Sequence, residues 1–265
     1  MPRKWFNAKE KEESIELDIY GPIGSYWWDD DATSAKQVLD LLKNAGDKPI
    51  NIHVNSEGGS VFDGFAIYSQ LKQAKGKVTA YVDGLAASAA SYLIAAADEV
   101  VMSDVAWIMI HNASGWTGGD KSEMRKQADL LENIDNTIAS IYAKRSGQYS
   151  ADYFLELMNE ETWLDAEHAR DYGMVDTIEE GLQAVAHLNL HNEKLFATAP
   201  ARAREFFSRI ENAKPGSKDL ELVPSDTLAN LNSDEGSDAQ EGIIEVTQEQ
   251  SRIVVLDNKI YEERL

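Results

Sequence analysis

The stretch YVDGLAASAASYLIAAADEV, residues 81–100, places a strand-like segment directly before a run of small residues. Gly84 is suited to end the strand, and Ser88 stands where a helix would begin. Two interpretations fit this pattern. In the first, Ser88 caps a tightly packed helix. In the second, Ser88 is a nucleophile at a helix N-terminus, where free N–H groups and the helix dipole favour developing negative charge.

Strand and helix patterns alternate along the chain on both sides of this stretch. Apolar and polar residues alternate over 15–19, 50–54 and 78–82, which is typical of strands. Apolar residues recur at helical spacing over 35–45 and 62–69, between those strands. Two further apolar runs, EVVM and WIMIH, follow the small-residue run. The repeated order predicts an α/β core with parallel strands and right-handed crossovers.

The character of the sequence changes after Asp120. Residues 120–146 predict one long helix that Gly147 ends, and its apolar side exceeds what a lone solvent-exposed helix needs. We therefore expect this helix to pack against the core or against another subunit. Shorter helix patterns follow at 151–159 and 166–172, and MVDTI is typical of a last strand.

Two parts of the chain differ in composition. Residues 1–181 carry the strand and helix patterns, and we expect them to form one domain. Residues 182–265 are expected to be a C-terminal extension that is acidic and largely disordered. The stretch after about Lys214 is rich in Ser, Asp, Asn and Gly, and such a segment cannot bury enough apolar surface to order itself.

Composition excludes several classes of function. The formal net charge of −21 argues against a nucleic-acid backbone or an anionic membrane as the main partner. The chain has no cysteine, which excludes disulfides, thiolate metal sites and cysteine nucleophiles. The segment MPRKWFNAKEKEE lacks the apolar core of a signal peptide, and the weakly apolar run 84–97 is too short to span a bilayer. We expect a cytoplasmic protein.

Two features beside Ser88 bear on its chemistry. NSEGGS, residues 55–60, predicts a strand-to-helix corner whose Gly58 and Gly59 permit positive φ and expose backbone N–H groups, as an anion cradle requires. The simpler interpretation of this corner is an ordinary turn. A serine nucleophile also needs a base. His111 ends the WIMI strand and begins a glycine-rich loop, where a general base is commonly presented.

The other histidines have weaker cases for a role in chemistry. His53 falls within a strand and is expected to be structural, and His168 falls in a polar helix. His187 and His191 have the spacing of a metal pair, but no acidic third ligand is indicated. The chain also contains no GxxxxGK[ST] nucleotide-binding motif. We therefore expect neither a metal site nor a cofactor.

Four motifs together give a more specific signal: NSEGGSVFDGFAIYSQL, GLAASAAS, MIH and ETWLDAEHARDYGMVD. In this order and with these gaps, they resemble the proteolytic subunit of the Clp protease family over roughly residues 15–180. The branch that they resemble most is the Clp-like proteases of phages and prophages, including head maturation proteases. The resemblance implies a crotonase-like (Clp protease-like) spiral of β-α units with a protruding long helix.

The same resemblance implies roles for individual residues. Ser88 in GLAAS matches the nucleophile of the family. His111 in MIH matches the base. Gly59, the second glycine of NSEGG, and Ala89, the residue after the serine, match the positions whose backbone N–H groups form the oxyanion hole.

The residue that orients the histidine is the one departure among these matches. The family usually has aspartate at this place, whereas the matching residue here is Glu161 of EETWLDA. Glutamate can orient an imidazole as aspartate does, but its side chain is one methylene longer. Asp165, in the same motif, is the alternative.

These matches imply a serine endopeptidase that hydrolyses peptide bonds in polypeptide substrates. The branch implies a head maturation protease that acts on capsid or scaffold proteins, in the host cytoplasm or the assembling prohead. The family also implies a ring-shaped homo-oligomer. MPRKWFNAKEKEE bears little resemblance to the segment with which the cellular family docks an ATP-driven unfoldase, so dependence on an unfoldase is not implied. Two alternatives stay open: a catalytically inactive capsid assembly or scaffold protein, and a crotonase-fold acyl-CoA enzyme.

Overall fold

A computed structural model describes residues 6–10, 13–24, 32–180, 198–204, 251–256 and 259–264. The chain divides into two compact units, Met1–Leu220 and Glu221–Leu265. In the second unit, β9 (Ser251–Leu256) pairs antiparallel with β10 (Lys259–Arg264), in a region for which the sequence indicates no clear fold. Most of the extension that we expect to be disordered lies outside the described residues, as do His187 and His191.

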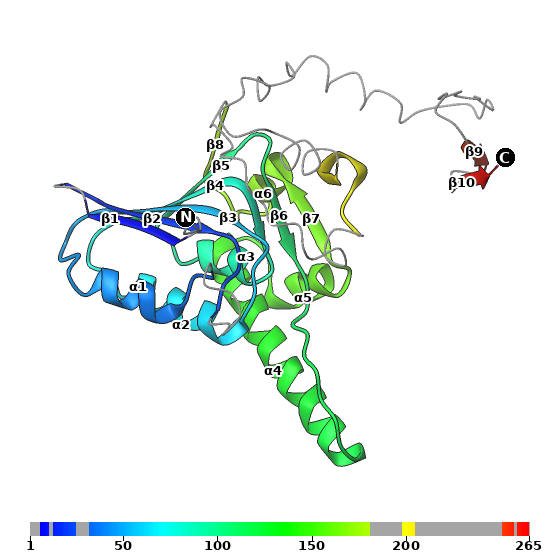
Figure 1. Ribbon diagram of the computed structural model, residues 1–265, viewed down its shortest axis with the longest axis horizontal. Coiled ribbons are helices and arrows are strands. Elements are labelled where there is room, and N and C mark those ends of the chain that lie inside the picture. The colour runs from blue at the N-terminus through cyan, green and yellow to red at the C-terminus, as the bar shows by residue number, and fades with distance from the viewer. Residues whose placement is uncertain are drawn as a thin grey trace, which may run out of the picture. The chain divides into compact units, whose positions relative to one another are not determined.

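An eight-stranded sheet forms the body of the first unit (Figure 1). Its strands are β1 (Phe6–Glu10), β2 (Ile15–Tyr20), β3 (Ile50–Ser56), β4 (Val78–Ala87), β5 (Glu99–Ser103), β6 (Trp107–Ile110), β7 (Thr162–Asp165) and β8 (Thr177–Glu179). The main path runs β1-β2-β3-β4-β5-β8, and its neighbours are parallel from β2 to β8, whereas β1 is antiparallel to β2. The predicted α/β core with parallel strands is confirmed.

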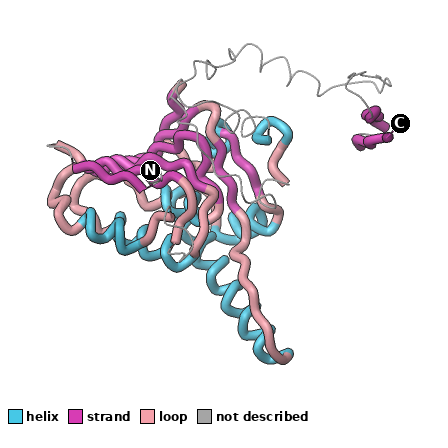
Figure 2. Tube along the Cα trace, in the orientation of Figure 1, coloured by secondary structure: helices cyan, strands magenta, loops and turns pink. Residues whose placement is uncertain are grey.

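Helices supply the crossovers that parallel strands require. They are α1 (Ala35–Leu42), α2 (Val61–Lys72), α3 (Ala89–Ile94), α4 (Lys121–Ser146), α5 (Ala151–Asn159) and α6 (Ala166–Asp171). Figure 2 shows the first three on one side of the main sheet, and the strand residues that alternate toward that side are fully buried. Within the described ranges, no helix combines the length and the apolar character that a membrane span requires.

A bend in β4 decides where the candidate site lies. Between the pair Val54–Val82 and the pair Ser56–Ala86, β4 accommodates two more residues than β3 does. The first part of β4 pairs with β5, and its last part, up to Ala87, pairs with β6. The carboxyl end of β4 therefore leaves the main path and joins β6, which in turn pairs antiparallel with β7 (Figure 1).

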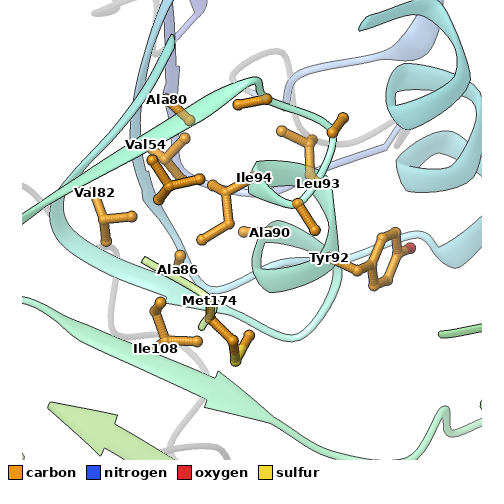
Figure 3. Packing of buried hydrophobic residues seen from close by; sticks show 14 of the residues in the cluster. Val54, Ala80, Val82, Ala86, Ala90, Tyr92, Leu93, Ile94, Ile108 and Met174 are labelled. Carbon is orange, nitrogen blue, oxygen red and sulfur yellow. The ribbon is translucent and has the colours of Figure 1, made fainter. Parts of the chain in front are cut away.

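Small side chains let α3 lie close to the sheet. Every residue of α3 is buried, and Figure 3 shows Ala90 and Ile94 packed among side chains of β3 and β4. Gly64 of α2 touches another side of α3, where a Cβ atom at position 64 would lie 2.3 Å from Tyr92 Oη. The alanine-rich run of the sequence therefore serves close packing, as the first interpretation of that stretch expects.

The long helix α4 begins at a capping box formed by Asp120 and Glu123 and ends at Gly147, whose φ of 65° is left-handed. All of its buried residues lie from Ile134 onward, so its N-terminal half extends away from the sheet (Figure 1). Met124 is 44% exposed in that half. The predicted long helix is confirmed, and only its second half packs against the domain.

Packing of α5 on α4 gives a first prediction. Phe154 of α5 is fully buried, and its ring lies on Tyr142 of α4 with centroids 5.6 Å apart. Phe154→Ala should lower the free energy of unfolding by about 3–5 kcal/mol, because it removes buried contacts and leaves a cavity. Phe62 of α2 is 66% exposed, so Phe62→Ala should change this free energy by less than about 0.5 kcal/mol. Chemical denaturation of both variants measures the difference, and equal losses would contradict the described packing.

Candidate active site

Ser88 lies at the N-cap position of α3, directly after β4, with φ 52° and ψ −121°. A non-glycine residue in such a conformation costs roughly 1–3 kcal/mol and persists only where its surroundings hold it. The side chain of Ser88 makes no capping hydrogen bond. The N-cap interpretation is therefore wrong, and the hydroxyl is directed elsewhere.

The Ser88 hydroxyl meets the imidazole of His111, and Ser88 Oγ and His111 Nε2 are 2.8 Å apart. Pairing between two strands produces this contact. Ala87, the last residue of β4, lies opposite Met109 of β6, and Ser88 N–H donates to Met109 O at 2.9 Å. Because His111 directly follows β6, its side chain reaches the serine from the neighbouring strand.

Burial controls the protonation of His111. Desolvation lowers the pKa of His111 below the ordinary histidine value, and the negative charges of Glu161 and Asp135 offset part of that effect. A lowered pKa keeps the imidazole neutral at neutral pH. Its Nε2 is then able to accept a proton from Ser88.

The strand register places Glu161, and not Asp165, beside His111. The last pair of the antiparallel strands β6 and β7 joins the residue before His111 to the residue after Glu161. Asp165 lies opposite Trp107, at the other end of the two paired strands. It is four residues from Glu161, which is about 13 Å along a strand. Asp165 instead caps α6, where it accepts from His168 N–H at 3.1 Å and contacts the His168 ring at 2.7 Å.

The carboxylate of Glu161 has a bonding partner in the segment 198–204. Glu161 has φ 51°, and its Oε1 accepts a hydrogen bond from Thr198 Oγ1. In the described part of the chain, no carboxylate lies within hydrogen-bond distance of His111 Nδ1. Glu161 therefore acts on His111 through its charge in this conformation.

Asp135 is a second carboxylate near His111, and sequence reasoning missed it. It lies in α4, and its Oδ1 accepts a hydrogen bond from Ala113 N–H at 2.7 Å, which ties the loop after His111 to the helix. Burial raises the pKa of Asp135. A signal was available in the sequence, because Asp135 stands three residues before Ile138 on the apolar side of a predicted helix.

The glycine corner between β3 and α2 packs directly against the start of α3. Gly58 has φ 92°, and a Cβ atom there would lie 2.7 Å from both Ser88 Cβ and Ala89 N. Gly59 has φ 148°, and a Cβ atom there would lie 2.1 Å from Ile23 O. Both positions therefore require glycine, and the corner is more than an ordinary turn.

Ser91, the other serine of the small-residue run, holds a structural position. It is fully buried, and its Oγ donates to Ser88 O at 2.5 Å and lies 2.6 Å from the hydroxyl of Tyr142 in α4. These contacts tie the first turn of α3 to α4. Of the two serines, Ser88 is the one whose hydroxyl faces a histidine.

His53 lies in β3, away from this site, and its contacts are those of a structural residue. Its Nδ1 lies 3.0 Å from Asp83 Oδ2, which raises the pKa of His53, and its ring stacks on Tyr81 with centroids 4.8 Å apart. Across the described ranges, no group of three His, Cys, Asp or Glu side chains is placed to hold a metal ion.

Comparison with known proteins adds an independent observation. The Clp protease family matches residues 21–181. The chain is 29% identical over 193 residues to the ATP-dependent Clp protease proteolytic subunit of Pleurastrum terricola, which covers 67% of the chain and 96% of that protein. It is 34% identical over 151 residues to proteolytic subunit 3 of Streptomyces coelicolor, covering 56% of the chain and 69% of that protein. It is 35% identical over 161 residues to proteolytic subunit 1 of Streptomyces avermitilis, covering 58% of the chain and 74% of that protein.

Proposed function

Because the chain belongs to the Clp protease family, we propose that it is a serine endopeptidase that hydrolyses peptide bonds in polypeptide substrates. The observation that carries this proposal is the 2.8 Å contact between Ser88 Oγ and His111 Nε2. A serine hydroxyl is a weak nucleophile until a base removes its proton. A partly buried, neutral imidazole at hydrogen-bond distance is such a base.

The proposed reaction has two halves. His111 Nε2 takes the proton of Ser88 as Oγ attacks the scissile carbonyl, and the same proton passes to the leaving amine as the peptide bond breaks. A water molecule, deprotonated by His111, then attacks the acyl-enzyme ester. The ester bond breaks, the substrate leaves with a new carboxyl end, and Ser88 regains its proton from His111. Glu161 stabilises the imidazolium that exists between proton transfers.

We assign the oxyanion hole to the backbone N–H groups of Gly59 and Ala89. The N–H of Ala89 belongs to the first turn of α3, where an α-helix leaves such groups without an internal partner. The close packing of Gly58 on Ala89 N brings the glycine corner to the same place. One such donor typically contributes about 2.7–4 kcal/mol of transition-state stabilisation.

A finer proposal concerns the biological setting. The motif resemblance to phage and prophage enzymes supports a role in head maturation, with capsid or scaffold proteins as substrates, in the host cytoplasm or the assembling prohead. The chain also continues to residue 265, past the family match, which leaves room for a segment that delivers the protease to its substrates. The Ser88–His111 pair argues against an inactive scaffold protein and against an acyl-CoA enzyme, because neither needs a serine beside a histidine.

Substitution of the proposed nucleophile and base gives the most direct test. Ser88→Ala should abolish hydrolysis of a fluorogenic peptide and labelling by a serine-reactive phosphonate. His111→Ala should lower activity by several orders of magnitude, because Ser88 loses its base, and both variants should keep the wild-type circular dichroism spectrum. Ser91→Ala is the matched control and should still be labelled. Mass spectrometry that finds the phosphonate on Ser91, or full activity in Ser88→Ala, would contradict the assignment.

The two candidate carboxylates make opposite predictions. Glu161→Gln should reduce kcat for peptide hydrolysis, though less than His111→Ala does, because an orienting residue acts through the base. Asp165→Asn should leave kcat close to the wild-type value, because Asp165 lies at the far end of β7. Steady-state kinetics of both variants measures the difference. A crippled Asp165→Asn beside a near-normal Glu161→Gln would show that the register argument selects the wrong carboxylate.

We also propose a ring-shaped homo-oligomer. Support comes from the N-terminal half of α4, which leaves the domain with Met124 and Leu130 each 44% exposed, and from Trp116 in the preceding loop, which is 93% exposed. Light scattering should report a mass several times that of the 29.4 kDa chain, and Leu130→Glu should lower it. A monomer at micromolar concentration would refute this proposal.

A further inference from the structure

A second cluster of buried side chains lies on the face of β6 that is opposite the main core. Its members come from β4, β6 and a later segment, with one β7 residue packed against them: Leu85, Ala87, Trp107, Met109, Ala199 and Ala203, with Trp163. The alternate residues of the same strands, such as Ile108, belong to the main core. The segment 198–204 therefore covers an apolar face of the sheet beside the proposed active site.

This segment follows the family-matched residues 21–181 and is held to the sheet by small side chains (yellow in Figure 1). Ala199 and Ala203 are one helical turn apart, and their exposed fractions are 3% and 0%. Arg204 N–H donates to Pro200 O at 2.9 Å and closes that turn. Alanine at both buried positions lets the backbone of the segment approach the strands closely.

Two polar contacts join the segment to the two ends of β7. Thr198 Oγ1 donates to Glu161 Oε1 just before β7, and an Arg202 guanidinium nitrogen lies 3.9 Å from Asp165 Oδ2 at its end. Glu161 and Asp165 are four positions apart in the sequence, as are Thr198 and Arg202, so the segment runs alongside β7 in the same direction. Burial of the alanines thus holds Thr198 next to Glu161.

We propose that Thr198 is a positioning residue for Glu161, so that a segment outside the family-matched region completes the active site. This inference rests on the proposed function, because it gives Thr198 a part in the same reaction. Glutamate has one more rotatable bond than aspartate, and the loss of rotamer freedom opposes holding it in one geometry. A donor on Oε1 restricts the carboxylate and keeps its negative charge near the imidazole of His111.

The effect of this restraint on His111 has a definite sign. Two carboxylates raise the pKa of His111 against the effect of its burial: Glu161, before β7, and Asp135, in α4. When Glu161 is free to move away, its share is lost and the pKa of His111 falls. Peptide hydrolysis needs the neutral imidazole, so the acid limb of the pH–rate profile then moves to lower pH while the plateau rate drops.

The test uses two full-length variants that separate the hydroxyl from the shape of the side chain. Thr198→Val removes the hydroxyl, and we expect a loss in kcat of about three- to tenfold, an unchanged KM and an acid limb at lower pH. Thr198→Ser keeps the hydroxyl and should behave as the wild type does. The double variant Glu161→Gln/Thr198→Val should lose no more than Glu161→Gln alone, because the hydroxyl acts through that carboxylate.

Docking of the segment has its own pair of variants. Ala203→Asp places a charge in the covered cluster, so it should release the segment and reproduce the kinetic and pH effects of Thr198→Val. Arg204→Gln changes an exposed position of the same segment and is the matched control, with wild-type kinetics expected.

The proposal is overturned by wild-type kinetics in Thr198→Val, by a rise in its activity, or by additive losses in the double variant. Its failure is distinguishable from failure of the proposed function, which occurs when the wild type is neither labelled at Ser88 nor active on peptides. Titration of His111 by NMR in full-length Ser88→Ala needs no activity. A His111 pKa that Thr198→Val leaves unchanged in that background would overturn the role of Thr198 in either case.

Discussion

The hydrogen bond from Ser88 N–H to Met109 O is the interaction on which the arrangement of the site depends. It forms because β4 bends with two extra residues and pairs its last residues with β6. The same pairing positions both partners of the proposed catalytic contact, since Ser88 follows β4 and His111 follows β6. A slip of one residue in this register would turn the His111 side chain to the other face of the strand, away from the serine.

The backbone conformation around this contact is energetically unfavourable, and packing of the surrounding core holds it in place. Among the described residues, Ser88 and Glu161 are the non-glycine residues with positive φ, and Gly58, which packs against Ser88, also has positive φ. Such conformations persist where packing and hydrogen bonds over-determine them. Here every residue of α3 is buried, Ser91 of the same helix donates to the Ser88 carbonyl, and the hydroxyl of Tyr142 from α4 contacts Ser91 Oγ. The alanine-rich helix therefore both fills the core and fixes the turn that presents the serine hydroxyl.

The sequence predicts those parts of this arrangement that depend on local patterns of apolar and polar residues. Period-two and helical patterns in alternation indicate parallel strands, and the sequence places both Ser88 and His111 where such strands end. The choice of Glu161 needed the motif resemblance, and Gly84, which the sequence indicates as the end of a strand, lies instead among the extra residues within β4. The contacts of Asp135 and Thr198 could not be predicted from the sequence. They join segments that are distant along the chain, and they depend on how α4 and residues 198–204 pack.

Nearby carboxylates and burial change the pKa of His111 in opposite directions. The carboxylates of Glu161 and Asp135 raise the pKa of His111, and desolvation lowers it by more. In the proposed reaction the imidazole is therefore neutral before Ser88 attacks, and the two negative charges then stabilise it little. Once Ser88 transfers its proton, the imidazolium interacts with both carboxylates in a site of low dielectric constant, where such interactions are strong. Because burial keeps the imidazole neutral before the attack, the carboxylates stabilise the transition state more than the ground state. Only stabilisation of the transition state relative to the ground state accelerates the chemical step.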